Sequence, residues 1–154
     1  MFIINVLIFS RKNAEKWKNC KDSISFEKAA IISFHDPDKA DLIDYSQKTD
    51  RVFYIGIPDI SYDDLQDCGY TYDSFFPKAE ELAKFIIDAY NDWYDFICQC
   101  EHGESRSAAT AAAIMEFYNH NGIEVFANYR FCPNQMIYNK LYKVLCDSEG
   151  KVSE

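Results

Sequence analysis

The sequence predicts an α/β protein of three layers, in which helices cover both faces of a mostly parallel sheet of about four to five strands. Two observations lead to this fold class. The chain contains short, almost entirely apolar runs, which are typical of strands covered on both faces. These runs alternate with longer segments whose apolar residues recur at helical spacing, and such alternation favours parallel strands joined by helical crossovers.

The apolar runs predict four strands. They lie at residues 2–9, 29–34, 52–57 and 94–99, which read FIINVLIF, AAIISF, VFYIGI and YDFICQ. The first run has no basic region before it and no small-residue cleavage site after it. It therefore indicates a strand and not a signal peptide.

Four helices are predicted at residues 13–20, 74–91, 105–120 and 134–146. In the second helix, Pro77 falls in the first turn, where a missing N–H costs little. The third is rich in alanine, the strongest helix former, and ends at Asn121 and Gly122. The fourth follows Pro133 and turns an apolar stripe toward the core, made up of Met136, Ile137, Leu141 and Leu145.

Length and composition fit one domain. The chain has 154 residues and is 48% hydrophobic, enough to bury a core without disulfides. We therefore predict a single domain over residues 1–147 and a flexible tail over residues 148–154. The net charge of −9 disfavours nucleic acid and membrane surfaces as partners, because both attract basic patches. The six cysteines, in a chain without a secretory signal, predict free thiols and a cytoplasmic location.

The stretch ICQCEHGESRSAATAAAI, residues 97–114, joins the fourth strand to the third helix. Ligands of such sheets bind beyond the carboxyl ends of the strands, which is where Cys100 lies. Gly103 lets the backbone approach an anion closely, and the loop N–H groups and the helix dipole favour one. Arg106 can bind two phosphate oxygens at once. These surroundings predict that Cys100 is a nucleophilic thiolate, with the Ser107 hydroxyl as a donor to its sulfur.

The pattern C-x2-G-x2-R-S, here CEHGESRS, resembles the signature loop of the cysteine-dependent protein tyrosine and dual-specificity phosphatases. Farther along, CPNQMIYNKL is similar to the segment that supports this loop in small dual-specificity enzymes. Upstream, VFYIGIPD resembles the strand that precedes their general acid. The resemblance covers residues 52–145. It implies a protein tyrosine phosphatase-like fold that hydrolyses phosphate monoesters: phosphotyrosine or phosphoserine/threonine in proteins, or a small aryl or alkyl phosphate.

The resemblance also implies a reaction that needs no metal and no cofactor. Cys100 attacks phosphorus to form a phosphocysteine, which water then hydrolyses. Arg106 holds the phosphate, and Ser107 helps the thiolate to leave. The remaining phosphate contacts are backbone N–H groups of the loop, which belong to Glu101, His102, Gly103, Glu104, Ser105 and Arg106.

A general acid must protonate the leaving group. Asp59, just after VFYIGI and Pro58, is the first candidate, followed by Asp63 and Asp64 and then by Asp67. Asn134, in the supporting segment, is expected to brace the loop.

Two features depart from the family pattern. Gln99 stands where the family usually has histidine, so part of the network that tunes the thiolate is different. Glu101 and Glu104 lie within the loop and are expected to point outward at the rim. There they would repel substrates that carry additional phosphates.

Other hypotheses remain open from the residues. A phosphate-binding pseudophosphatase with weak or no turnover would keep the same loop. Cys98, Cys100 and His102 could bind zinc, although a fourth ligand at the usual spacing is missing. Arsenate reductases and rhodanese-like sulfurtransferases also use a cysteine loop. The sequence predicts no particular oligomeric state.

The motif FHDPDKAD, residues 34–41, follows the second predicted strand. His35, Asp36 and Asp38 therefore either shape a pocket or bind a cation at the edge where Cys100 lies, or simply form a turn. The residues alone favour neither interpretation.

Overall fold

The computed structural model describes residues 4–20, 28–39 and 41–152 of the chain. Four parallel strands form its sheet in the order β1-β4-β2-β3. The strands are β1 (Val6–Phe9), β2 (Ala29–His35), β3 (Val52–Gly56) and β4 (Asp95–Gln99). The helices are α1 (Arg11–Asn19), α2 (Ala79–Asn91), α3 (Arg106–Asn119), α4 (Ile123–Phe126) and α5 (Gln135–Val152), with a 3-10 turn, η1, at Tyr62–Asp64.

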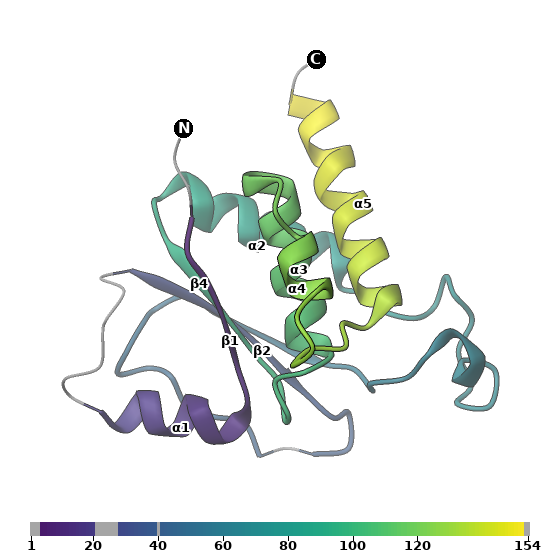
Figure 1. Cartoon of the computed structure of the whole chain (residues 1–154), viewed down its shortest axis with the longest axis horizontal. Helices are drawn as coiled ribbons and strands as arrows, with labels where there is room; N and C mark the ends of the chain where they lie inside the picture. Colours follow the sequence, from purple (N-terminus) through teal and green to yellow (C-terminus); the bar gives the residue numbers. More distant parts are fainter. Residues whose placement is uncertain (1–3, 21–27, 40, 153–154) are drawn as a thin grey trace.

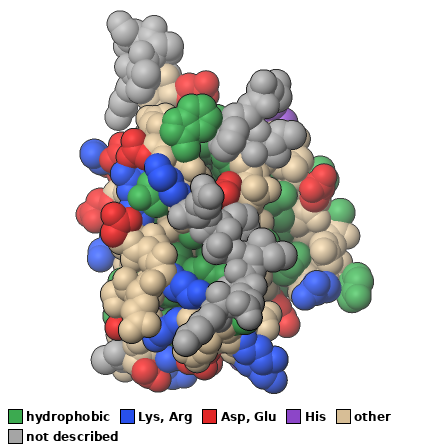
Figure 2. Space-filling view, turned by 90° about the vertical axis from the view of Figure 1, so that its left-hand side faces the viewer, with side chains coloured by type: hydrophobic (Ala, Val, Ile, Leu, Met, Phe, Trp, Pro, Cys, Tyr) green, Lys and Arg blue, Asp and Glu red, His purple; other side chains and the backbone are tan. Residues whose placement is uncertain are grey.

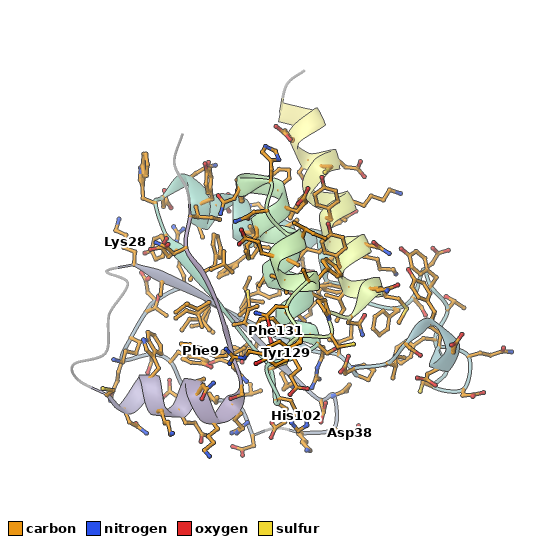
Figure 3. The ribbon with its side chains drawn as sticks, viewed as in Figure 1. Phe9, Lys28, Asp38, His102, Tyr129 and Phe131 are labelled. Atoms are coloured by element: carbon orange, nitrogen blue, oxygen red, sulfur yellow. The ribbon has the colours of Figure 1, made fainter. Side chains whose placement is uncertain are left out.

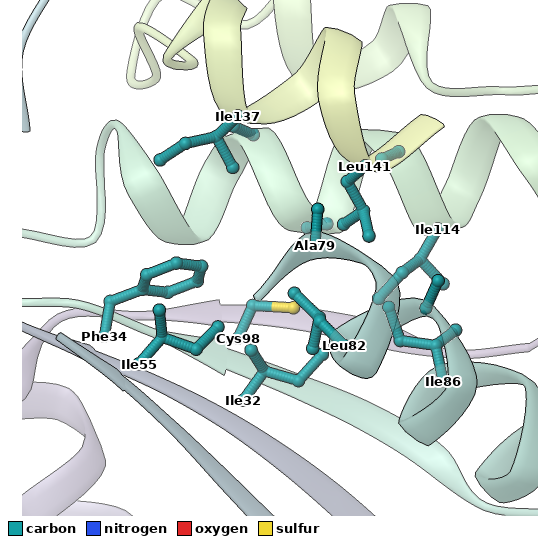
Figure 4. Packing of buried hydrophobic residues seen from close by; sticks show 14 of the residues in the cluster. Ile32, Phe34, Ile55, Ala79, Leu82, Ile86, Cys98, Ile114, Ile137 and Leu141 are labelled. Atoms are coloured by element: carbon teal, nitrogen blue, oxygen red, sulfur yellow. The ribbon is translucent and has the colours of Figure 1, made fainter. Parts of the chain in front are cut away.

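Helices cover both faces of the sheet, as Figure 1 shows. On one face, Trp17 of α1 packs in a cluster with Ile31 of β2. On the other face, α2, α3 and α5 lie over the same strands. Figure 4 shows this second core, in which Cys98 of β4 lies among apolar side chains that include Leu82 and Leu141. The predicted three-layer α/β class with a parallel sheet is confirmed.

The register of the sheet brings several strand ends together. Gln99, the last residue of β4, pairs with Phe9 at the end of β1 and with Ser33 near the end of β2. The loops that follow these strands therefore start at one edge of the sheet. This edge is where the sequence places the cysteine loop.

All four predicted strands are present, and three of them agree with the predicted bounds within one residue. The first begins at Val6 and not at residue 2, and residues 2 and 3 lie outside the described part of the chain. Helix α2 differs more, because it begins at Ala79 and not at residue 74. Reciprocal bonds between Thr71 and Ser74 form a turn there, and Phe76 has a φ of +64°, which ends any helix before Pro77. Pro77 therefore precedes the helix.

The carboxyl-terminal helix is longer than predicted. Helix α5 continues to Val152, so residues 148–152, expected to belong to a flexible tail, are helical, and residues 153–154 lie outside the described part of the chain. The Ser148 hydroxyl donates to the Val144 carbonyl oxygen at 2.8 Å, and the neighbouring Glu149 and Lys151 are good helix formers. The short helix α4 was not predicted.

The charged side chains do not gather on the face shown in Figure 2. There, Lys and Arg side chains of the described residues are interspersed with Asp and Glu. The net charge of −9 is thus not concentrated in a single patch on this face. Among the helices of the described residues, none is both long enough and apolar enough to cross a membrane.

The loop between β4 and α3 passes very close to the connection between β1 and α1. Gly103 has a φ of +68°, in the left-handed region that favours glycine. A Cβ at this position would lie 2.6 Å from the backbone nitrogen of Ser10 and 2.9 Å from the carbonyl carbon of Phe9. The Arg11 N–H donates to the Glu101 carbonyl oxygen at 3.1 Å, which links the two segments. Gly103 is therefore required both for the turn and for the close approach.

We predict that Gly103→Ala lowers the free energy of unfolding by about 2–4 kcal/mol. The alanine would be strained by the positive φ, and its Cβ would also force the Ser10 backbone to move, so the two costs are summed. Gly69→Ala is the matched control. Gly69 also has a positive φ of +82°, but a Cβ there would meet nothing within 4 Å. Its cost should be strain alone, about 1 kcal/mol. Urea unfolding measures both changes, and equal costs would contradict the role of the close approach.

Candidate active site

Cys100 lies directly beyond β4, at the start of the loop that leads into α3. The residue is 3% exposed, and its Sγ lies 3.1 Å from the Ser107 Oγ in the first turn of α3. The Cys100 N–H donates to the Phe9 carbonyl oxygen at 3.2 Å. The structure thus brings together the predicted nucleophile, Cys100, and the predicted hydroxyl donor, Ser107. They lie at the carboxyl ends of the strands, where the end of β1 holds the Cys100 backbone.

Helix α3 fixes the positions of Arg106 and Ser107. Its alanines are buried on more than one side: Ala109 and Ala113 pack in the main core, whereas Ala108 and Ala112 pack against Val125 of α4. A helix that is apolar on every side belongs in the interior of a protein. The alanine run therefore serves close packing, and it anchors the end of the loop rigidly.

The Arg106 side chain is also buried, with 4% of the residue exposed. Its Nη1 donates to the Asp36 Oδ1 and to the Ile57 carbonyl oxygen, each at 2.8 Å. Its Nε is buried and has no hydrogen-bond partner in the described part of the chain. A buried donor without a partner is costly, so this guanidinium is suited to an acceptor that arrives from outside the chain.

Asp36 is charged at neutral pH. Partial burial acts to raise its pKa, but the hydrogen bond and the charge of Arg106 outweigh this effect and hold the pKa below its usual value of 3.8. The stabilisation from the ion pair is therefore complete above that value and is lost as the pH falls through the lower pKa of the folded protein. The Lys39 N–H donates to the Asp36 carbonyl oxygen at 3.1 Å, so residues 36–39 of the motif FHDPDKAD also form a turn.

Asp59 reaches the loop. Its Oδ1 accepts hydrogen bonds from the Ser105 hydroxyl at 2.6 Å and from the Asn134 Nδ2 at 3.0 Å. Of the other candidate acids, Asp64 accepts from the Ser61 hydroxyl at 2.9 Å at the start of η1. A cavity of about 510 Å³ opens beside the loop and is lined by residues 59–64, Ser105 and residues 132–136. Asp59 is thus the candidate acid that the structure ties to a loop residue by a side-chain hydrogen bond.

Asn134 connects the loop to its surroundings. Its N–H donates to the Ser105 carbonyl oxygen at 3.2 Å, and its Nδ2 also donates to the Ile60 carbonyl oxygen at 2.9 Å. Its Oδ1 accepts from the Ile137 N–H at 3.1 Å in the first turn of α5. One side chain therefore links the loop, the segment that carries Asp59 and the start of a helix, as a brace would.

Gln99 lies beneath the loop and is 2% exposed. Its Oε1 accepts from the Ser33 hydroxyl at 2.5 Å and from the Tyr45 hydroxyl at 2.8 Å. Burial raises the pKa of Tyr45, so its phenol stays a proton donor. The sequence reasoning missed both partners of Gln99. Ser33 carried a signal, since it is a polar residue within an apolar strand, whereas nothing in the sequence marks Tyr45.

The remaining loop residues lie at the rim. Glu101, His102 and Glu104 are exposed, as expected for the two glutamates. Figure 3 shows His102 and Asp38 at the same end of the molecule, where β1, β4 and β2 finish. Burial in the core raises the pKa of the Cys98 thiol, which therefore stays protonated. Within the described residues, no group of three or more His, Cys, Asp or Glu side chains is arranged to hold a metal ion.

Comparison of the sequence with family models finds no match, and comparison with curated proteins finds none either. The structure does match solved structures. Human tyrosine phosphatase-like serine/threonine/tyrosine-interacting protein is 17% identical over 83% of this chain and 80% of the other, with a TM-score of 0.52. Human DUSP28 is 13% identical over 95% and 94%, with a TM-score of 0.55.

A leucine rich repeat and phosphatase domain containing protein from Entamoeba histolytica is also similar. It is 16% identical over 100% of this chain and 94% of the other, with a TM-score of 0.55. At identities this low, the similarity in structure establishes a shared fold. The chain therefore has the fold of the dual-specificity and tyrosine phosphatases, as the resemblance of its loop predicted.

Proposed function

We propose that this protein is a cysteine-dependent phosphatase that hydrolyses phosphate monoesters through a phosphocysteine on Cys100. The observation that supports this most strongly is that one loop holds both a buried thiol, Cys100, and a buried guanidinium, Arg106. The Cys100 Sγ lies 3.1 Å from a hydroxyl that can donate to a thiolate. The Arg106 Nε is buried without a described acceptor, and a phosphate oxygen would supply one.

The proposed reaction has two steps. The Cys100 thiolate attacks phosphorus, the bond from phosphorus to the ester oxygen breaks, and Asp59 gives its proton to the leaving alcohol or phenol. Water then attacks the phosphocysteine, the bond from sulfur to phosphorus breaks, and Asp59 takes a proton from the water. The Ser107 hydroxyl stabilises the thiolate that leaves. Arg106 and the N–H groups of residues 101–106 stabilise the charge on the phosphoryl oxygens in both steps.

The substrate class follows from the rim of the loop. The exposed Glu101 and Glu104 oppose polyphosphorylated substrates, which leaves phosphorylated proteins or small monoesters. The cavity beside the loop is lined in part by Ile60, Tyr62 and Met136, whose side chains can contact a phenyl ring or peptide. Because Cys100 must stay reduced to react, we place the protein in a reducing compartment, the cytoplasm.

A second candidate function is a phosphate-binding module with weak or no turnover. Two observations favour it: Gln99 replaces the usual histidine, and the Asp59 carboxylate oxygen already accepts hydrogen bonds from Ser105 and Asn134. One structural neighbour is itself named a phosphatase-like interacting protein. Such a module would bind phosphopeptides without hydrolysing them.

Cys100→Ser tests the nucleophile. We expect it to abolish hydrolysis of an aryl phosphate in the presence of EDTA, because serine is not ionised at neutral pH. Binding of the phosphate analogue tungstate should persist, since Arg106 and the loop are unchanged. Cys68→Ser, at an exposed position outside the cavity beside the loop, is the control and should keep full activity. Unchanged turnover in Cys100→Ser would refute the mechanism.

Asp59→Asn tests the acid. Asparagine keeps an oxygen that can accept from Ser105 and Asn134 but cannot give a proton to the leaving group. We expect kcat to fall about 100-fold or more for an alkyl phosphate and much less for an aryl phosphate with a good leaving group. Asp63→Asn, in the same cavity wall, should behave like the unsubstituted protein. If Asp63→Asn shows the loss and Asp59→Asn does not, the assignment of the acid is wrong.

A further inference from the structure

Asp36 has no part in the reaction described above, although it contacts the residue that is proposed to hold the phosphate. It follows β2, in the motif FHDPDKAD, and its Oδ1 accepts from Arg106 Nη1 at 2.8 Å. The two residues lie 70 positions apart in the sequence and meet because β2 and β4 pair in parallel. The contact is thus specified by the sheet register.

Both hydrogens of Arg106 Nη1 have acceptors within the protein. An Nη group carries two hydrogens, and the acceptors of this one are the Asp36 carboxylate and the Ile57 carbonyl oxygen, both at 2.8 Å. These acceptors come from the segments after β2 and β3. Two acceptors from two segments fix both the position and the plane of the guanidinium.

The opposite edge of the guanidinium consists of Nε and Nη2. Nε is buried without a partner in the described part of the chain. In the rigid fork of arginine, Nε and Nη2 point in parallel and match two oxygens of a phosphate. The contacts on Nη1 therefore decide which edge stays available to an anion.

We propose that Asp36 is a positioning residue, whose acceptor oxygen holds Arg106 by Nη1 so that Nε and Nη2 face the phosphate at the loop. This inference deepens the proposed function, since it rests on Arg106 as the phosphate ligand. Asp36 itself does not touch the substrate. Its negative charge offsets the buried guanidinium when the site is empty.

Other charged groups near Asp36 contribute less to this arrangement. Lys39 Nζ lies 3.6 Å from the second carboxylate oxygen, but its side chain is 66% exposed, so water screens the pair. His35 uses its Nδ1 for a contact with the Asp36 carbonyl oxygen, not with the carboxylate. The buried partner of the carboxylate is Arg106.

The test measures tungstate binding by calorimetry in the unsubstituted protein and in Asp36→Ala, Asp36→Asn and Asp38→Ala. Alanine removes the acceptor, so tungstate should bind about 10-fold more weakly. Asparagine keeps an acceptor oxygen without the charge, and its Kd should stay within about threefold of the unsubstituted value. Asp38, exposed in the same turn, is the control and should show no change. Circular dichroism and thermal unfolding establish that each variant is folded.

Three results would overturn the proposal: unchanged or tighter binding in Asp36→Ala, equal weakening in Asp36→Ala and Asp36→Asn, or no tungstate binding by the unsubstituted protein. Equal weakening would mean that the charge of Asp36 acts and its geometry does not. Turnover is measured separately with an aryl phosphate, where kcat/KM should fall in Asp36→Ala and recover in Asp36→Asn. If the unsubstituted protein binds tungstate without turnover, the proposed function fails while the binding series still decides the role of Asp36.

Discussion

The buried guanidinium of Arg106 is the constraint on which the rest of the site depends. It begins α3, and its Nη1 joins the segments that follow β2 and β3 through Asp36 and the Ile57 carbonyl oxygen. A charge at 4% exposure is stable only with such partners, so the loops around it have little freedom. Asn134 donates to the carbonyl oxygen of the neighbouring Ser105, and Gly103 lets the loop pass close to Phe9 and Ser10 at the end of β1. The site is thus built from several strand ends that share one edge.

The sequence predicted what depends on local pattern. Apolar runs of strand length located the four strands, and their alternation with helices predicted the parallel sheet. The loop could be predicted because its parts lie within eight residues: Cys100, Gly103, Arg106 and Ser107 are each needed for one aspect of anion binding. Their placement between a buried strand and an alanine-rich helix then predicted the fold that the structural neighbours share.

The sequence could not predict what depends on contacts across the sheet. For Asp36 the sequence leaves a pocket, a cation site and a turn equally open, and its pairing with Arg106 follows from the register of β2 and β4. The bond from Tyr45 to Gln99 spans 54 positions and has no local signal. The start of α2 was misplaced because the positive φ of Phe76 is set by its packing in the core, which overrides local helix propensity. The hydrogen bond from Ser105 to Asp59 spans 46 positions and likewise has no local signal, and the role of Asp59 as the acid remains a prediction.

The central claim is that Cys100 carries the phosphoryl group during turnover. The most direct measurement is mass spectrometry of the protein quenched in acid while it hydrolyses an aryl phosphate, with Ser107→Ala as a variant in which the second step is slowed. The account predicts one phosphoryl group on the peptide that contains Cys100, in a larger fraction of the Ser107→Ala molecules than of the unsubstituted protein. Release of phosphate with no phosphoryl group on that peptide in either protein would contradict it.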